Sequence, residues 1–210
     1  MVTPVQRSIL VNNGELTIGV LALQGDFDAH RQTLNRLGAR TVLVRKPGEL
    51  ETIDGLIIPG GESSTFLKFL EREGFLEQLR DFVSRKPAFG TCAGAILLAK
   101  QVSNPVQESL NALDISVQRN AYGRQIDSSI MSAPTKLGGP DLEMVFIRAP
   151  RIERVGKGVE VLAEREHHPV LVREGQILAA TFHPELSDDP RVHKLFLEMV
   201  RRYRSGDRTA

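Results

Sequence analysis

The sequence predicts an α/β fold of three layers, in which helices flank a mostly parallel central sheet and antiparallel strands follow in the C-terminal half. Residues 17–23 and 55–59 are short, continuous apolar runs, as expected of strands buried on both faces of a parallel sheet. Each is followed by a turn that contains glycine and then by a segment with helical spacing, which is the alternation of a doubly wound sheet. Beyond residue 101, strand-like runs follow one another without helices between them.

Capping residues and apolar spacing predict the order of the first helices and strands in the N-terminal half. Asp26 is a predicted N-cap, and Gly38 is predicted to end the helix that follows it. Residues 41–44 form a second strand-like run, and apolar residues between 66 and 83 recur at the spacing of one or two amphipathic helices, interrupted near Gly74. The next strand and helix contain residues 87–89 and 95–99.

The C-terminal half is predicted to be richer in antiparallel strands, packed on the same sheet or extending it. A Glu-Gly-Gln sequence at 174–176 predicts a hairpin turn, and Pro190 is expected in the first turn of the last helix. We predict an N-terminal extension at 1–16, a single domain at 17–204 and a flexible tail at 205–210. The strand-like runs in this half are residues 114–118, 124–130, 143–147, 159–164, 169–173 and 177–182.

Composition excludes several classes of protein. The 27 basic and 26 acidic side chains give a formal net charge of +1, so no overall field favours nucleic acid or an anionic membrane. No apolar run approaches the ~20 residues of a membrane-spanning helix, and the first 13 residues lack a signal-peptide pattern. A single cysteine without a secretion signal predicts a reducing, cytoplasmic setting.

The most informative motif is Gly-Thr-Cys-Ala-Gly at residues 90–94, between a predicted strand and a predicted helix. Gly-x-Cys-x-Gly in this position is the cysteine form of a nucleophile elbow, a tight turn that lifts the central side chain above the sheet edge. The N-terminal end of the following helix favours a thiolate there. A buried core cysteine is the alternative, and the motif alone does not decide between the two.

His183 is the best candidate for the base that a thiol nucleophile needs. It follows a predicted buried strand, and residues i and i+2 of an extended segment face the same side. Glu185 is therefore expected to hold one ring nitrogen while the other faces the thiol. The carboxyl ends of parallel strands meet at one edge of the sheet, so this strand end and the elbow should lie together. A polar loop without catalytic function is the alternative.

The other four histidines are expected to have no role in the site. His30 and His193 occupy helical patterns, where a surface or half-buried structural position is predicted. His167 and His168 lie at a predicted turn between two strands. Neighbouring residues on a strand point to opposite faces, and no cysteine or third histidine lies nearby in the sequence, so they make a poor metal site.

The two glycines at 60 and 61 follow another buried strand. Glycine allows the backbone to turn its N–H groups outward, which suits an oxyanion hole built from the peptide. The carboxylate of Glu62 beside this loop is suited to pairing with a substrate ammonium group. A phosphate-binding loop or a simple turn would explain the two glycines equally well.

Taken in order, residues 60–63 (Gly-Gly-Glu-Ser), 90–94 and 183–185 (His-Pro-Glu) resemble the class I (triad) glutamine amidotransferases. The three-layer fold expected above is the fold of that family. Further motifs are similar to those of the glutaminase subunits of pyridoxal 5′-phosphate synthase, and the resemblance runs from about residue 17 to residue 203. These motifs are residues 23–25, 120–125, 146–150 and 182–186.

The resemblance implies a role for each motif residue. Cys92 is the implied nucleophile, His183 the base and Glu185 the residue that orients it. Backbone N–H groups of Gly61 and Ala93 are expected to face the oxyanion. Two arginines and a glutamate suit the carboxylate and ammonium of a free amino acid, although surface ion pairing is the default for such arginines. The implied glutamine-binding residues are Gly60, Gly61, Glu62, Arg124, Ile147 and Arg148.

The implied reaction is the hydrolysis of L-glutamine to L-glutamate and ammonia, which requires no metal or organic cofactor. The resemblance also implies a hetero-oligomer with a synthase subunit, which takes the ammonia and builds pyridoxal phosphate from a pentose phosphate and a triose phosphate. Three alternatives stay open. The chain could be a glutaminase that serves another synthase, a non-catalytic regulatory subunit on the same fold, or a cysteine hydrolase or redox sensor.

Overall fold

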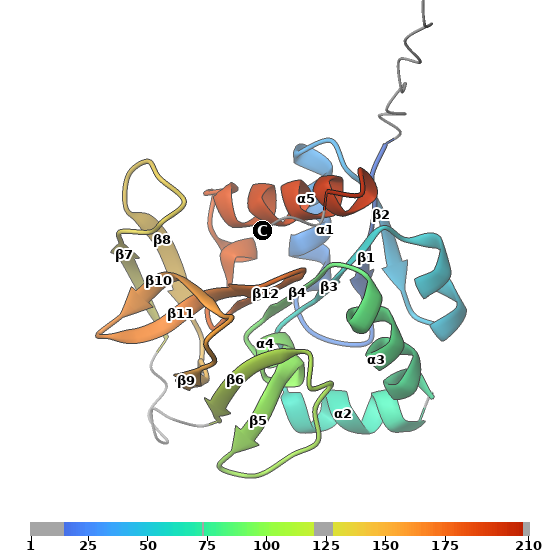
Figure 1. The fold of residues 1–210 in the computed structure, drawn as a ribbon, viewed down its shortest axis with the longest axis horizontal. Helices are drawn as coiled ribbons and strands as arrows, with labels where there is room; N and C mark the ends of the chain where they lie inside the picture. The colour runs from blue at the N-terminus through green and yellow to red at the C-terminus, as the bar shows by residue number, and fades with distance from the viewer. Residues whose placement is uncertain (1–14, 73, 120–127, 208–210) are drawn as a thin grey trace, which may run out of the picture.

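The computed structural model describes residues 15–72, 74–119 and 128–207. Its centre is a seven-stranded sheet with the strand order β10-β11-β12-β4-β3-β1-β2 (Figure 1). The five neighbouring strands β12, β4, β3, β1 and β2 are mutually parallel. Strand β11 is antiparallel to β12, and β10 is antiparallel to β11. The bounds are β1 Thr17–Leu21, β2 Arg40–Val44, β3 Gly55–Ile58, β4 Ala88–Thr91, β10 Glu160–Arg165, β11 His168–Glu174 and β12 Ile177–Ala180.

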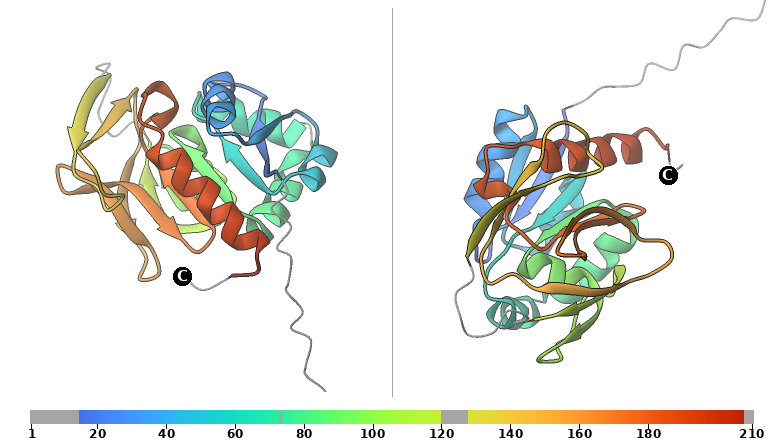
Figure 2. Two further views of the ribbon diagram at one scale, coloured as in Figure 1. Left: turned by 90° about the horizontal axis from the view of Figure 1, so that it is seen from above. Right: turned by 90° about the vertical axis from the view of Figure 1, so that its left-hand side faces the viewer.

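Helices cover both faces of this sheet, which confirms the predicted three-layer α/β fold. On one face lie α1 (Phe27–Arg36) and α5 (Arg191–Arg204). On the other lie α2 (Ser63–Arg72), α3 (Phe75–Arg85) and α4 (Ala93–Leu98). Figure 2 shows α5 in red between the blue helix α1 and the orange and yellow strands. Two short 3₁₀ helices, η1 (Pro47–Thr52) and η2 (Pro184–Leu186), complete the helical elements of the described residues.

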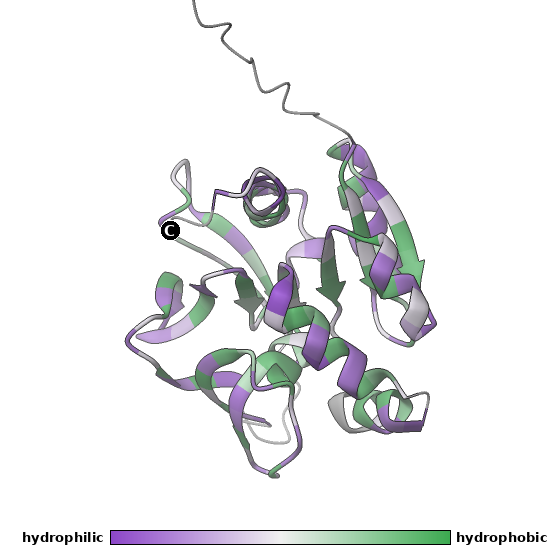
Figure 3. Cartoon of the chain, turned by 45° about the vertical axis from the view of Figure 1, so that its right-hand side comes forward, coloured by the Kyte–Doolittle hydropathy of each residue, from purple (hydrophilic) through white to green (hydrophobic). Residues whose placement is uncertain are grey.

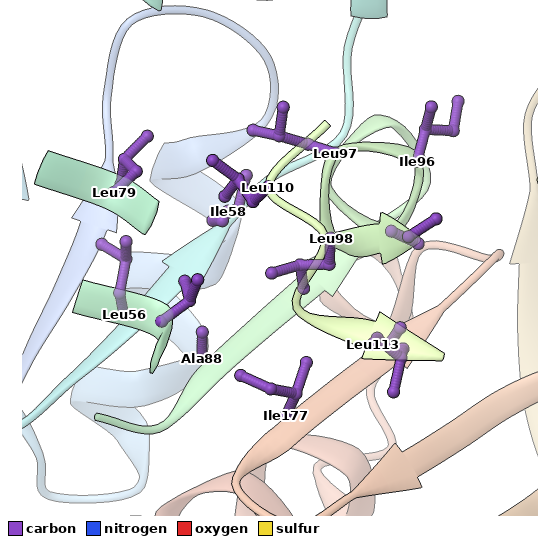
Figure 4. Close-up of a cluster of buried hydrophobic side chains, with 14 of the residues drawn as sticks. Leu56, Ile58, Leu79, Ala88, Ile96, Leu97, Leu98, Leu110, Leu113 and Ile177 are labelled. Carbon is purple, nitrogen blue, oxygen red and sulfur yellow. The ribbon is translucent and has the colours of Figure 1, made fainter. Parts of the chain in front are cut away.

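The two-residue period of the strands sorts the core into two clusters. Leu56 and Ile58 face the cluster under α2, α3 and α4, whereas Ile57 between them faces the cluster under α1 and α5. Figure 4 shows the first cluster, in which Leu79, Leu98 and other side chains meet. The central strands are green almost throughout in the hydropathy colouring, and the helices alternate between green and purple (Figure 3). The inner parallel strands β1, β3, β4 and β12 are therefore buried on both faces, as the sequence predicts.

Two small sheets pack beside the central one. A three-stranded sheet is formed by β5 (Ala99–Ser103), β6 (Leu113–Gln118) and β9 (Arg151–Val155), and a two-stranded sheet by β7 (Ser129–Ala133) and β8 (Leu142–Phe146). Strands β5 and β9 were not predicted. The apolar spacing of α4 runs on into β5 at Ala99, and β9 contains three charged residues in five, so neither has the pattern of a buried strand.

Several local predictions are confirmed and others need correction. Gly38 follows α1 with a φ of 76°, and Gly74, with a φ of 68°, separates α2 from α3. Asp26 precedes α1 as predicted, but its side chain makes no capping hydrogen bond. Pro190 is the N-cap of α5 and not a residue of its first turn. The predicted strand at 124–130 lies largely outside the described residues.

The predicted domain limits remain predictions, because most of the two terminal segments lies outside the described residues. The first strand begins at Thr17 and the last helix ends at Arg204. Within the described part of the chain, every helix is too short or too polar to cross a membrane.

Candidate active site

Cys92 occupies a strained turn between strand β4 and helix α4. Its φ of 48° and ψ of −104° lie outside the regions that non-glycine residues favour. Such a conformation costs about 1–3 kcal/mol and persists only where neighbouring structure holds it. The Cys92 N–H donates to Ala180 O at 2.8 Å, which ties the turn to the end of β12. This is the predicted elbow, and the Cys92 residue is 7% exposed.

Close packing explains the glycine that follows the elbow cysteine. A β-carbon at Gly94 would lie 2.0 Å from Ile58 O, so no side chain fits between α4 and the end of β3. This contact lets α4 start directly beneath the strand ends and holds its first turn against the sheet. The glycine on the C-terminal side of the elbow therefore has a specific cause in packing.

His183 and Glu185 form the predicted pair beside the elbow. His183 Nδ1 lies 2.8 Å from Glu185 Oε1, and both residues are buried, at 4% and 5% exposure. The backbone N–H of His183 donates to the backbone carbonyl of Val145 at 2.8 Å, so β8 holds this segment in place. The His183 ring and the Cys92 side chain both lie beside Gly60, where an added β-carbon would be 2.5 Å from His183 Cε1 and 3.2 Å from Cys92 Cβ. The elbow and the end of β12 thus bring thiol, imidazole and carboxylate together.

The electrostatics of this cluster favour a protonated His183. Burial lowers the pKa of His183, but the bonds to the Cys92 side chain and to Glu185 raise it more, to about 10. Burial raises the pKa of Glu185, but the nearby rings of His30 and His183 outweigh it, so the pKa of this carboxyl falls below its ordinary value. At neutral pH the cluster therefore contains a carboxylate and an imidazolium, which can supply a proton.

A cavity of about 270 Å³ opens over Cys92 and His183, which is near the lower end of the range for small-molecule sites. Four of the predicted substrate residues line it, namely Gly61, Glu62, Ile147 and Arg148. Cys92 Sγ lies 3.9 Å from Ile147 O. The remaining lining residues are Asp26, Ile96, Arg119 and Pro150.

Comparison with known proteins explains this arrangement. The model of the SNO glutamine amidotransferase family matches residues 20–202. The chain belongs to this family. A protein of Koribacter versatilis (strain Ellin345) named pyridoxal 5′-phosphate synthase subunit PdxT is 67% identical over 193 residues, with 92% of this chain and all of the relative covered. The protein of the same name in Thermotoga maritima is 50% identical, with 89% of this chain and all of the relative covered.

Solved structures agree with the family assignment. A crystal structure described as a glutamine amidotransferase has a TM-score of 0.81 and 48% identity, and it covers 87% of this chain and 98% of that one. A protein from Thermoplasma acidophilum, described as part of a putative GMP synthase, shares the fold, with a TM-score of 0.66, 20% identity and coverage of 93% and 98%. The prediction of a glutamine amidotransferase of the pyridoxal 5′-phosphate synthase type is confirmed.

The predicted glutamine-binding residues of this amidotransferase fall into two groups. Glu62 and Arg148 both line the cavity, each shortly after the C-terminal end of a strand, β3 and β8 respectively. Glu62 also has a structural contact, because Glu62 Oε2 accepts the Thr65 N–H at 2.7 Å at the start of α2. Arg124, the second predicted arginine, and the motif at 120–125 lie outside the described residues.

The predicted oxyanion donors come from the start of α4 and from the loop after β3. Ala93 is the first residue of α4, so its N–H has no carbonyl partner within that helix. Gly61 lines the cavity with a φ of 143°, a conformation that glycine tolerates. Gly60 does not line the cavity directly but packs beneath it, where a β-carbon would lie 2.5 Å from His183 Cε1.

Two charged residues of the cavity were not predicted as site residues. Arg119 follows β6, is 8% exposed, and has its guanidinium 3.9 Å from Glu62 Oε1. Asp26, considered only as a helix cap, lines the cavity from the start of α1. Neither residue belongs to a local motif, so sequence spacing gave no signal for them.

The prediction that His30 and His193 are exposed or half-buried is wrong, because both are fully buried beside the site. His30 Nε2 lies 3.3 Å from Glu185 Oε2. In the described residues, one potential metal ligand group contains Asp26, His183 and Glu185, with ligand atoms within 4.8 Å of one another. His183 Nδ1 and Glu185 Oε1 already bond to each other, so we assign no metal to this group.

Proposed function

We propose that the chain hydrolyses L-glutamine to L-glutamate and ammonia through Cys92, His183 and Glu185, and that the ammonia passes to a synthase subunit that makes pyridoxal 5′-phosphate. The observation that carries the proposal is the buried His183–Glu185 pair, 2.8 Å apart, whose ring lies beside the elbow cysteine and lines the same cavity. A thiol nucleophile, a base and an orienting carboxylate are the elements of a catalytic triad.

In the first half of the reaction the Cys92 thiolate attacks the side-chain carbonyl carbon of glutamine. A carbon–sulfur bond forms, and the oxyanion of the tetrahedral intermediate faces the backbone N–H groups of Ala93 and Gly61. The carbon–nitrogen bond then breaks while His183 gives its proton to the departing nitrogen. A raised pKa suits this step, because His183 holds the proton at neutral pH until ammonia leaves.

In the second half, water hydrolyses the thioester. His183, now neutral, takes a proton from the water as it attacks the carbonyl carbon, and the carbon–sulfur bond breaks. Glutamate leaves, and the thiolate and the protonated His183 ring are restored. Glu185 holds the ring by Nδ1 throughout, so Nε2 carries the proton in both directions.

The cavity supports recognition of a free amino acid. We assign the carboxylate of Glu62 to the α-ammonium group of glutamine and the guanidinium of Arg148 to its α-carboxylate. Arg124 is proposed as the second arginine on sequence resemblance alone. The guanidinium of Arg119 lies 3.9 Å from Glu62 Oε1, and Arg119 lines the same cavity. Its positive charge therefore contributes to the electrostatic field in which the ammonium and carboxylate groups of the substrate bind.

The partner and the setting are part of the same proposal. The relatives are named as subunits of pyridoxal 5′-phosphate synthase, and we propose that this chain likewise acts in a hetero-oligomer with a synthase subunit that accepts its ammonia. A cytoplasmic location is supported by the free, reduced Cys92 on which the chemistry depends.

Nitrogen transfer from labelled glutamine tests the proposal. The chain would be mixed with the synthase subunit, the pentose phosphate, the triose phosphate and glutamine carrying heavy nitrogen in its amide. We expect the heavy nitrogen in pyridoxal 5′-phosphate, with an equal amount of glutamate released. The Cys92→Ala variant should give neither product from glutamine, yet its complex should incorporate heavy nitrogen from added ammonium. Labelled product from glutamine with Cys92→Ala would contradict the proposed nucleophile.

A further inference from the structure

Two buried histidines form a chain of contacts behind the carboxylate that faces His183. His30 on α1 and His193 on α5 are both fully buried. His30 Nε2 lies 3.3 Å from Glu185 Oε2 and 3.2 Å from Thr91 Oγ1. His30 Nδ1 lies 3.0 Å from His193 Nε2. A continuous line of polar contacts therefore runs from α5 through α1 to the triad.

The chemistry of these groups fixes where the protons lie. Burial is the main influence on both imidazoles: it lowers the pKa of His30 and lowers that of His193 to about 3. Each ring is therefore neutral at pH 7 and carries one proton. Glu185 as a carboxylate can only accept, so the His30 proton lies on Nε2. His30 Nδ1 is then an acceptor, and His193 Nε2 donates to it.

The surroundings of the two rings support this assignment. The charged or titratable groups that act on His30 are Asp26, His183, Glu185 and His193, and Arg36 also acts on His193. The Phe89 ring packs edge-on against both imidazoles, with centroids 6.2 Å from His30 and 6.0 Å from His193. This apolar wall excludes water, and desolvation keeps both rings neutral.

We propose that His30 is a positioning residue, whose Nε2–H lies 3.3 Å from Glu185 Oε2 and keeps this carboxylate against His183, and that His193 fixes the tautomer of His30. The inference rests on the proposed function, because it assigns Glu185 to orienting His183. His30 does not line the cavity, so its effect on catalysis is transmitted through the carboxylate.

The arrangement of Glu185 shows what His30 contributes. Oε1 is bonded to His183 Nδ1, whereas Oε2 is buried and makes no well-aligned hydrogen bond within the described residues. The contact with His30 Nε2 gives this buried oxygen a polar neighbour. Without it, a buried carboxylate oxygen would lose its neighbouring donor, and such losses are relieved by taking up a proton or by rotating away. Either response would weaken the hold on His183.

The neutral state of His30 is part of its positioning role. A protonated His30 would attract the Glu185 charge as strongly as His183 does, and the two rings would compete for one carboxylate. A neutral ring that places an N–H beside Oε2 orients Glu185 and leaves its charge to His183. Residues that orient a functional group from behind in this way are worth ~10–100-fold in activity where they have been measured in metal sites.

Three variants separate this role from simple packing. His30→Leu fills the space without a donor. His30→Gln restores an amide donor toward Glu185 and a carbonyl acceptor toward His193. Leu34→Met is the control, because Leu34 lies in the same helix as His30, is fully buried and belongs to the apolar cluster that contains Phe89. Glutaminase activity would be measured in the complex with the synthase subunit, and kcat and KM determined separately.

We expect His30→Leu to lower kcat by about 10–100-fold with little change in KM. His30→Gln should stay within a few-fold of wild type, and Leu34→Met should match wild type. His193→Phe, which removes the donor to His30 Nδ1, should lower kcat in the same direction by a smaller factor. It also provides a test in the case that His30→Leu does not fold.

An NMR titration of the His183 ring adds a readout that packing would not change and that needs no substrate. We expect the pKa of His183 in His30→Leu to fall below its wild-type value, and His30→Gln to restore it. Wild-type kcat or an unchanged His183 titration in His30→Leu would overturn the inference, as would a failure of His30→Gln to recover both. A wild-type protein without glutaminase activity would count against the proposed function alone, because the titration stands independently.

Discussion

Gly60 lies directly against the ring of His183, so that a β-carbon at position 60 would come within 2.5 Å of His183 Cε1 and 3.2 Å of Cys92 Cβ. Real β-carbons essentially never approach another heavy atom to 2.5 Å, and the ring cannot simply retreat, because Glu185 holds it by Nδ1. The absence of a side chain at Gly60 therefore sets the position of the histidine as well as the shape of the loop.

Gly60→Ala should lower kcat for glutamine by about a hundredfold, because a displacement of roughly 1 Å in a catalytic group has this effect. The measurement is glutamate release in the presence of the synthase subunit. Gly48→Ala is the matched control, since a β-carbon there meets nothing within 4 Å. Equal activity of the two variants would mean that His183 does not depend on this contact.

His183→Asn should remove glutamine hydrolysis, whereas Glu185→Gln should leave a measurable remnant. In the proposed mechanism the base takes part in both proton transfers, and loss of the orienting group costs less when the base remains. Steady-state rates of glutamate release give the ranking. The opposite ranking would mean that the roles of the two residues are reversed from those proposed.

Arg148→Ala should reduce kcat/KM for glutamine by roughly a hundredfold or more, which corresponds to about 3 kcal/mol. In the proposed site the guanidinium pairs with the α-carboxylate, so its loss would leave the substrate charge without a partner. Alkylation of Cys92 by a small uncharged reagent should change far less. Arg40→Ala is the control, because Arg40 is exposed on β2. A parallel fall of hydrolysis and alkylation would show that Arg148 supports the elbow instead.

Acid should destabilise the fold through the buried histidines. The pKa of His193 is about 3 in the folded chain, against an ordinary value of 6.5, because burial disfavours its charged form. Between these values the unfolded chain binds a proton that the folded chain does not. The contribution of His193 is therefore complete above pH 6.5 and is lost as pH falls toward 3, at ~1.4 kcal/mol per pH unit.

Urea unfolding between pH 6.5 and about pH 5 measures this slope before the carboxyl groups titrate. His193→Gln should have a shallower slope than wild type, and part of the slope should remain because burial also lowers the pKa of His30. The same slope in both proteins would show that His193 is protonated in the folded state or that its titration has no effect on stability.

The sequence predicted the parts of the site that are local. The elbow, the His-Pro-Glu motif and the Gly-Gly loop each lie within a few residues at the end of a buried strand, and parallel strands bring such ends to one edge. The roles of these residues remain proposals, but their convergence on one cavity follows from that topology. Two further strands, β5 and β9, escaped prediction because their sequences lack a regular apolar pattern.

The parts that the sequence did not predict depend on long-range contacts. His30 and His193 are 163 residues apart, and helical spacing predicts a surface or half-buried position for each because it does not say what covers each helix face. Both lie in the layer between the sheet and its helices, where they meet only after β4, η2 and α5 have packed. Arg119 likewise reaches the cavity from the end of a peripheral strand.

Cys92 is the proposed nucleophile of glutamine hydrolysis. The most direct test of this role is glutamate release from L-glutamine by wild type and by Cys92→Ala, each in complex with the synthase subunit. Folding of the variant is checked by its thermal unfolding, and complex formation by its comigration with the partner. We predict sustained turnover by wild type and none by a folded, complexed Cys92→Ala. Turnover by that variant near the wild-type rate would contradict the account.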